Sequence, residues 1–122
     1  MKTSKIKIIV IIAFLVLALP SLSFAGGNSG AQVIQQVKIG QGGTIQIWGD
    51  TGDWNNPDSC NSSKFILLLP SVGSVENLYY SEMYAFVVAG YLQSLSISGF
   101  LGGCSEVNGL TYPILRNVQS TK

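Results

Sequence analysis

Alternation of hydrophobic and polar residues, or an unbroken apolar run, predicts five β-strands in this chain. The five stretches are residues 32–39, 44–49, 64–70, 93–98 and 112–118. In the second stretch Ile45 and Ile47 share one face, which places Trp48 on the opposite, outward face. The third stretch contains a run of five apolar residues, and such a run is typical of a strand that is covered on both faces. Residues 50–63 and 99–109 are rich in turn-forming residues and are predicted to be connections.

One helix is predicted between the third and fourth strands. Ser81 is a favourable N-cap, and Glu82 lies in the first turn, where a negative charge suits the helix dipole. Residues 83–92 have no polar stripe apart from tyrosine hydroxyls, so the helix is apolar on every side. One sheet covers only one side of such a helix, which predicts a partner surface, most simply a second copy of the chain. The candidate interface residues are Phe65, Leu67, Met83, Tyr84, Val87, Val88 and Tyr91.

The order of three strands, a helix and two strands is that of an OB-fold, a partly open five-stranded barrel. We therefore predict a mainly β protein with one helix, an OB-fold-like five-stranded barrel in the order β-β-β-α-β-β. An unrelated α+β sandwich is the competing architecture. Cys60 lies just before the third strand and Cys104 just beyond the fourth, which suits a bridge between them in the barrel.

The N-terminal residues have the pattern of an export signal. A basic start with Lys2, Lys5 and Lys7 is followed by an apolar run, and small residues precede Gly26 at the positions that a signal peptidase recognises. The apolar run is shorter than the roughly 20 residues that a membrane-spanning helix requires, which favours cleavage over a permanent anchor. We predict a signal peptide over residues 1–25, a single domain over residues 26–122, and a secreted or periplasmic bacterial protein.

Export changes the charge and the redox setting that matter. Without the three signal lysines, four basic and six acidic residues remain, a net charge of −2. Four scattered cations do not form the patch that a nucleic acid requires, so nucleic acid is excluded as a partner. In an oxidising compartment, Cys60 and Cys104 predict one intramolecular disulfide, which stabilises by about 4 kcal/mol in the chain-entropy model. A redox-active thiol pair requires a closer spacing than this one.

The polar loop of residues 50–63 and the strand before it are the predicted ligand site. An indole beside Asp and Asn side chains is able to stack on a sugar while the polar groups bind its hydroxyls. The candidate ligand-binding residues are Gln46, Trp48, Asp53, Trp54 and Asn55. In the alternative, Trp54 folds back and covers the mouth of the barrel. The acidic residues of the loop match no calcium-binding pattern, so no metal site is predicted.

No catalytic residues or cofactors are predicted. The chain has no histidine, which removes Ser-His-Asp and Cys-His catalysis and the commonest metal ligand. Asp53 and Asp58 are the obvious choice for a catalytic carboxylate pair, but their setting in a turn-rich loop favours solvated turn residues. A non-catalytic protein is therefore predicted.

The apolar helix, the serine-rich stretch 93–98 and the sequence Thr111-Tyr112-Pro113-Ile114-Leu115 resemble the receptor-binding B subunits of AB5 toxins, particularly the subtilase cytotoxin B subunit and its uncharacterised bacterial relatives. The resemblance covers most of the mature chain in pattern and the helix-to-Pro113 segment in sequence. It implies an oligomeric ring that binds cell-surface glycans, with a toxin A chain as a possible partner. The alternative function is a periplasmic protein–protein interaction module, such as an inhibitor or accessory subunit.

Overall fold

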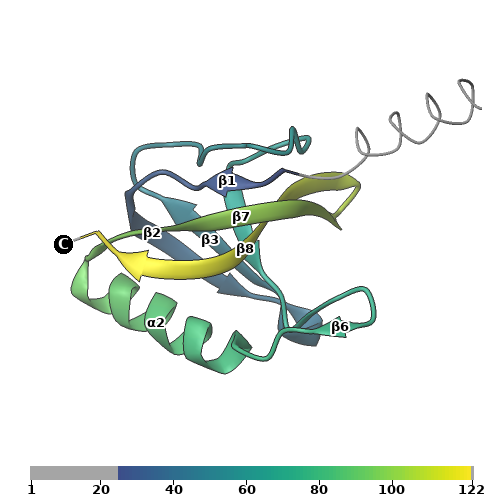
Figure 1. The fold of residues 1–122 in the computed structure, drawn as a ribbon. Coiled ribbons are helices and arrows are strands. Elements are labelled where there is room, and N and C mark those ends of the chain that lie inside the picture. Colours follow the sequence, from purple (N-terminus) through teal and green to yellow (C-terminus); the bar gives the residue numbers. More distant parts are fainter. Residues whose placement is uncertain (1–24, 122) are drawn as a thin grey trace, which may run out of the picture.

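The computed structural model describes residues 25–121, so the signal segment predicted over residues 1–25 lies outside the described residues except for Ala25. The elements in chain order are β1 (Gly27–Asn28), β2 (Gln32–Ile39), the 3-10 turn η2 (Gln41–Gly43), β3 (Ile45–Gly49), β4 (Phe65–Leu68), β5 (Ser71–Val72), β6 (Val75–Glu76), α2 (Tyr80–Gln93), β7 (Ser96–Val107) and β8 (Leu110–Ser120). In Figure 1, α2 lies along one side of the strands, and β1 with the β3–β4 loop lies on the opposite side.

Five strands pair in a ring that returns to its first member. Strand β2 pairs antiparallel with β3, and β3 pairs antiparallel with β4. Strand β8 then lies parallel to β4, with Leu67 opposite Ile114, and antiparallel to β7. Strand β7 returns to β2 through Gln32 opposite Ile97. Outside the ring, β1 pairs with a further part of β7, and β5 and β6 form a separate hairpin.

Within residues 25–121, the mainly β fold with one α-helix is confirmed, but the predicted order of elements was incomplete. It lacked the short strands β1, β5 and β6. The predicted connection over residues 99–109 was wrong, because β7 continues to Val107 and pairs with β8 along most of its length. The glycines of this segment suggested a loop, but at Gly99 the pairing of β7 with β8 itself requires a glycine. A Cβ on Gly99 would lie 2.1 Å from the Asn117 carbonyl oxygen.

A β-bulge sets the inward face of β2. Ile34 lies opposite Gly49 and Gln36 lies opposite Trp48, so Gln35 is an extra residue that the partner strand does not match. The bulge shifts the alternation, and both Ile34 and Val37 therefore contact the core although they are three residues apart. Without the bulge the two residues would face opposite sides of the sheet.

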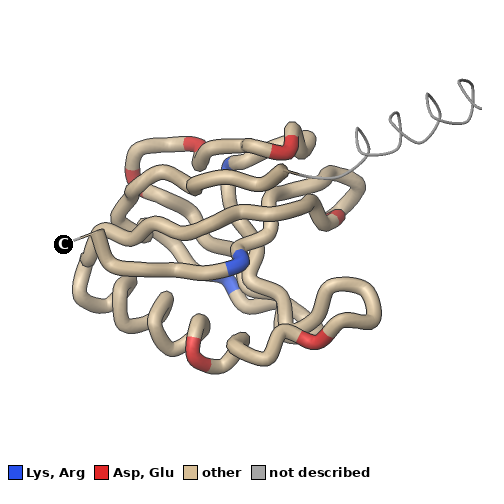
Figure 2. Tube along the Cα trace, viewed as in Figure 1, with Lys and Arg blue, Asp and Glu red and all other residues tan. Residues whose placement is uncertain are grey.

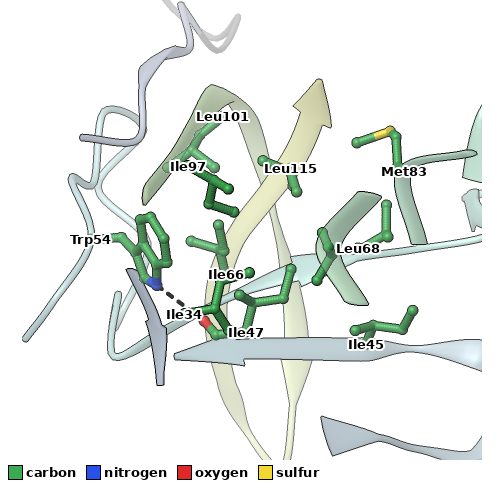
Figure 3. Packing of buried hydrophobic residues seen from close by; sticks show 11 residues of the cluster. Ile34, Ile45, Ile47, Trp54, Ile66, Leu68, Met83, Ile97, Leu101 and Leu115 are labelled. Atoms are coloured by element: carbon green, nitrogen blue, oxygen red, sulfur yellow. Dashed lines mark hydrogen bonds between the residues drawn. The ribbon is translucent and has the colours of Figure 1, made fainter. Parts of the chain in front are cut away.

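Strand β4 is covered on both faces, as its apolar run predicted. Ile66 and Leu68 belong to a core cluster between the strands and α2, shown in Figure 3. Phe65 and Leu67 point the other way, into a second cluster that includes Tyr112. Every residue of β4 is therefore buried within one chain.

Helix α2 packs on the sheet through one narrow stripe. Met83, Val87 and Gly90 are its buried residues, at spacings that place them on one face. A Cβ on Gly90 would lie 3.3 Å from the Ile97 side chain, so glycine allows close approach to β7. The predicted N-cap at Ser81 was wrong, since α2 begins at Tyr80. The Asn77 side-chain oxygen instead accepts a hydrogen bond from the Tyr79 N–H at 3.1 Å. Among residues 25–121, no helix has the length and apolar character needed to span a membrane.

Candidate functional site

Trp54 lies in the core and does not present a ring to a ligand. Its side chain is only 3% exposed, and its indole N–H donates a hydrogen bond to the Ile47 carbonyl oxygen at 3.0 Å (Figure 3). The ring packs against the same cluster as Ile47 and Ile66. The structure thus favours the alternative in which Trp54 folds back over the strands, and a sugar cannot stack on this indole.

The other predicted ligand residues do not converge on one surface. Trp48 faces outward from β3, as predicted, but its ring contacts Phe65 at 4.7 Å between centroids and is half-buried. Gln46 lies opposite Lys38 and Leu67 on the two neighbouring strands. Trp54 packs on the core-facing side of β3, where Ile47 lies. Gln46 and Trp48 flank Ile47 along the strand, so their side chains point to the opposite face.

The loop residues Asp53 and Asn55 are exposed, and the loop is tied to the strands by its backbone and amides. The Asn55 side chain donates to the Asn28 carbonyl at 3.0 Å, and the Gln32 side chain donates to the Asp53 carbonyl at 3.2 Å. Asn56 both accepts from the Cys60 N–H and donates to the Cys60 carbonyl, each at 2.8 Å. Within residues 25–121, no three Cys, Asp or Glu side chains gather as metal ligands would.

The predicted disulfide is present between Cys60 and Cys104, with 5.7 Å between the Cα atoms. It links the β3–β4 loop to the C-terminal part of β7. The carboxylate of Asp58 lies beside it and accepts two backbone hydrogen bonds, from the Gly26 N–H at 3.0 Å and the Gly103 N–H at 2.7 Å. These two bonds lower the pKa of Asp58, with a smaller contribution from the Ala25 N–H, against the opposing effect of desolvation.

Four of the seven predicted interface residues are buried inside the chain and are unavailable to a partner. Phe65, Leu67, Met83 and Val87 are at most 7% exposed. The half-buried Tyr84 and Val88 and the exposed Tyr91 remain on the surface of α2. The error has a physical source: the helix is apolar all round, so its composition did not show which stripe the sheet takes.

Several of the exposed apolar residues lie on the surface of α2 and just before it. Leu78, Tyr79 and Leu92 are 76%, 69% and 74% exposed, and Phe86 is also exposed. Ala85 and Ala89 lie between them on the outer side of the helix. Figure 2 shows that most of the Cα trace is uncharged and that α2 has a single charged position near its start. Met83, Val87 and Gly90 define the inner face of the helix, and the outer face then follows from the helical periodicity.

Two adjoining hollows lie between the start of α2, the β5–β6 hairpin and β8. The first has a volume of about 270 Å³ and is lined by residues that include Tyr79, Phe86 and Asn117. The second, of about 290 Å³, is lined mainly by the hairpin and residues 77–79. Tyr79 and Arg116 line both hollows, so the two form one surface groove, which we call the Tyr79–Arg116 groove. The sequence prediction missed this site completely.

The polar side chains of the groove are held in place from β7. The Arg116 Nε donates a hydrogen bond to the Gly102 carbonyl at 2.8 Å, which leaves the terminal guanidinium nitrogens beyond that contact. The Asn117 side-chain oxygen accepts from the Phe100 N–H at 3.0 Å, which turns its NH₂ group away from β7. Glu82 from α2 completes the rim with an exposed carboxylate. Aromatic, cationic, amide and anionic groups therefore meet on one surface.

The N-terminal end of α2 is anchored close to this groove. The Tyr80 hydroxyl donates a hydrogen bond to the Gly43 carbonyl in η2. Desolvation, together with the neighbouring Tyr84 ring, raises the pKa of Tyr80, so the hydroxyl keeps its proton and this bond at ordinary pH. Tyr79, the residue before it, is thereby fixed at the mouth of the groove.

Comparison of the chain with protein-family models, with curated proteins and with solved structures gives no significant match, so the function must be argued from the site itself.

Proposed function

We propose that this protein is an exported, non-catalytic, self-associating module that binds a glycan or glycoconjugate. The observation that carries the proposal is the Tyr79–Arg116 groove, where an exposed aromatic ring meets hydrogen-bonding side chains. This placement replaces the loop site around Trp54. Export rests on the N-terminal sequence pattern and agrees with the disulfide, which is typical of an oxidising compartment.

The ring of strand pairings supports an OB-like barrel as the scaffold. The five longer strands pair in one ring, with α2 between the third and fourth of them along the chain. OB-folds are small barrels that bind oligosaccharides and oligonucleotides on one face. The low cation content argues against the nucleic-acid member of this pair.

The groove has the chemistry that a sugar ring requires. The apolar face of a pyranose stacks on an aromatic ring, and its hydroxyls need donors and acceptors around that ring. Tyr79 supplies an exposed ring, and Phe86 lines the same hollow. The Arg116 and Asn117 side chains supply donors, and the Glu82 carboxylate supplies acceptors. A volume of about 270 Å³ suits one or two sugar units better than a long chain.

The outer face of α2 supports self-association. Its exposed residues Ala85, Ala89 and Leu92 carry no charge, and Glu82 is the only charged residue of the helix. Two identical faces of this kind are able to pack against each other without repulsion between like charges, as a symmetric interface requires. Small residues at the contact also let two helices approach closely. The partner that we propose is therefore a second copy of the chain.

A glycan array with the purified mature protein tests the ligand. We expect binding that Tyr79→Ala reduces at least tenfold, because the stacking surface is lost. Tyr91→Ala is the matched control, since Tyr91 is an exposed tyrosine on the same helix outside the groove. Absence of glycan binding, or equal affinity of the Tyr79→Ala variant and the native chain, would reject the glycan site.

The second candidate function is a protein–protein interaction module. Val75 and Leu78, two exposed apolar residues that line the second hollow of the groove, favour it, because a protein partner would cover both of them and a small sugar would not. Light scattering separates the two in part. A monomer at micromolar concentration would reject self-association and favour a foreign protein partner, whereas a stable oligomer would support the first candidate.

A further inference from the structure

The backbone nitrogen of Gly26, the residue that follows the predicted cleavage site, is hydrogen-bonded to a carboxylate. It donates to the Asp58 Oδ1 at 3.0 Å, while Asp58 Oδ2 accepts from the Gly103 N–H at 2.7 Å. The carboxylate thus joins the N-terminal segment to β7, two residues before Cys60 in the chain and next to the disulfide. The sequence pattern independently places the cleaved bond between Ala25 and Gly26.

Glycine is required at positions 26 and 27 for this seating. Gly26 has a φ of +70°, and a Cβ there would lie 2.6 Å from the Phe100 ring and 2.8 Å from the Leu101 carbonyl oxygen. A Cβ on Gly27 would lie 2.9 Å from Pro57. Immediately afterwards, β1 pairs with Phe100 and Leu101 of β7. The segment after the cleavage site is therefore fitted closely between β7 and the β3–β4 loop.

Cleavage would change the chemical nature of the donor. In the uncleaved chain the Gly26 nitrogen is a neutral amide, whereas after cleavage it is a free α-amino group that carries a positive charge below about pH 8. An ammonium at hydrogen-bond distance from a carboxylate forms a charge-assisted bond that is stronger than the bond from a neutral amide.

We propose that removal of the signal peptide creates an ion pair between the new α-amino group of Gly26 and the Asp58 carboxylate, which locks the mature N-terminus onto the disulfide-bearing end of the protein. This inference rests on the export that we propose. The step is hydrolysis of the Ala25–Gly26 peptide bond by a signal peptidase: water adds across the bond, the carboxyl group stays on Ala25, and the amine on Gly26 takes up a proton.

No cationic side chain is recorded as a partner of the Asp58 carboxylate among the described residues, so the amino group of Gly26 would be its cationic partner. The two oxygens of Asp58 accept hydrogen bonds from the backbone N–H groups of Gly26 and Gly103, which hold its pKa below the ordinary value, with a smaller contribution from the Ala25 backbone that cleavage would remove. The other charged side chains on the elements around it are Asp50, Asp53, Lys64, Glu106 and Arg116, and all of them are exposed. Among these, Arg116 is engaged with the Gly102 carbonyl.

The sign of the pH dependence follows from the raised pKa of a paired amine. The ion pair stabilises the folded protein fully below the ordinary α-amino pKa of about 7.7–8.0, and the stabilisation disappears as the pH rises through the raised value in the folded state. Acetylation of the α-amino group removes this alkaline dependence.

The test begins with the full chain expressed in a bacterial host and recovered from the periplasm or medium. Intact mass spectrometry is expected to give a mature chain that starts at Gly26. An NMR titration of the Gly26 signals is then expected to show an α-amino pKa about one unit higher in the native protein than in Asp58→Asn, a tenfold shift in the protonation equilibrium. Asp50→Asn is the matched control, because Asp50 also accepts a backbone N–H, from Val33 at 3.1 Å, but lies away from the N-terminus.

Gly26→Ala separates processing from seating. A small residue after the cleavage site still permits cleavage, but the added Cβ would collide with Phe100, so the ordinary α-amino pKa is expected to return. Should Asp58→Asn fail to fold, acetylated and free forms of the native mature chain give the same comparison through their unfolding midpoints at pH 7 and pH 10. A mass that shows a different mature start overturns the proposed processing, and hence the pair. A correct start with equal pKa values in the native protein and Asp58→Asn overturns the ion pair alone and leaves the export proposal standing.

Discussion

The β3–β4 loop and helix α2 differ in the opposite way from what their compositions suggest. The β3–β4 loop is rich in Asp, Asn and Ser, yet it buries Trp54 and ties itself to the strands through a disulfide and a series of backbone hydrogen bonds. Helix α2 is almost wholly apolar, yet it buries only Met83, Val87 and Gly90 and leaves its outer face exposed. A polar segment in this protein therefore builds structure, and the apolar segment is the one available for contact. We name these the loop side and the helix side.

The largest expected effect is on the loop side. Trp54→Ala removes a buried ring and leaves the Ile47 carbonyl without its partner, so we expect a loss of about 3–5 kcal/mol in the free energy of unfolding. Urea denaturation of the mature protein measures it. Trp48→Ala is the control, because the half-buried Trp48 lies outside the main core cluster and should cost clearly less. Equal losses in the two variants would mean that Trp54 is not the anchor of the loop.

The next largest effect concerns the bridge of the loop side. Replacement of Cys60 and Cys104 by alanine, or reduction of the bridge, should lower the melting temperature, with a loss of at most about 4 kcal/mol in the chain-entropy model. The mass that the native protein shows in solution near room temperature should stay the same, because the bridge lies away from the outer face of α2 through which we propose self-association. A change in mass measured by light scattering would show that the two sides are coupled.

A smaller effect is expected at acid pH. Because hydrogen bonds lower the pKa of Asp58 in the folded state, the carboxylate contributes stability above its ordinary pKa of about 3.9, and this contribution is lost as the pH falls through the lower folded value. Unfolding midpoints measured between pH 2 and pH 7 should therefore fall less steeply at the acid end in Asp58→Asn than in the native protein. Asp53→Asn, which alters an exposed carboxylate of the same loop, should retain the native profile.

The smallest effect on stability, and the sharpest test of the helix side, comes from Leu92→Ser. Leu92 is 74% exposed, so the free energy of unfolding of a single chain should change by no more than about 0.5 kcal/mol. Self-association, by contrast, should weaken measurably in sedimentation or light scattering. Leu110→Ser is the matched control, because Leu110 is an exposed leucine at the start of β8, just after the β7–β8 turn. If both variants associate like the native chain, the outer face of α2 is not the contact.

Local patterns in the sequence predicted the strands well where the pairing is regular. Residues 32–39 form β2 with the predicted bounds, and the inward faces of Ile45 and Ile47 are confirmed at 0% exposure. The errors arose where long-range contacts override local preference. The glycine-rich segment after Gly99 forms a strand because β8 lies against it, and the bulge at Gln35 changes the inward face of β2.

The candidate site was less accessible to sequence reasoning than the fold. Tyr79 and Arg116 are 37 positions apart in the sequence, and only the placement of α2 beside β8 brings them to one groove. The polar loop drew attention because Trp54 stands among Asp and Asn residues, a composition that fits both a binding loop and a turn. Burial decides between the two, and the hydrogen bond from the indole N–H to the Ile47 carbonyl satisfies the polar group of the buried ring.

The parallel pairing of β4 with β8 also sets the order in which the protein can assemble. Leu67 and Ile114 pair although a long stretch of chain separates them, and the same is true of Cys60 and Cys104. A chain that emerges N-terminus first holds β2, β3 and β4 well before the strands that close the ring exist. Such non-local contacts form slowly, because the entropy of a long loop is lost before the contacts compensate for it. The ring of strand pairings therefore closes only once β8, the last strand of the chain, is available to pair with both β4 and β7.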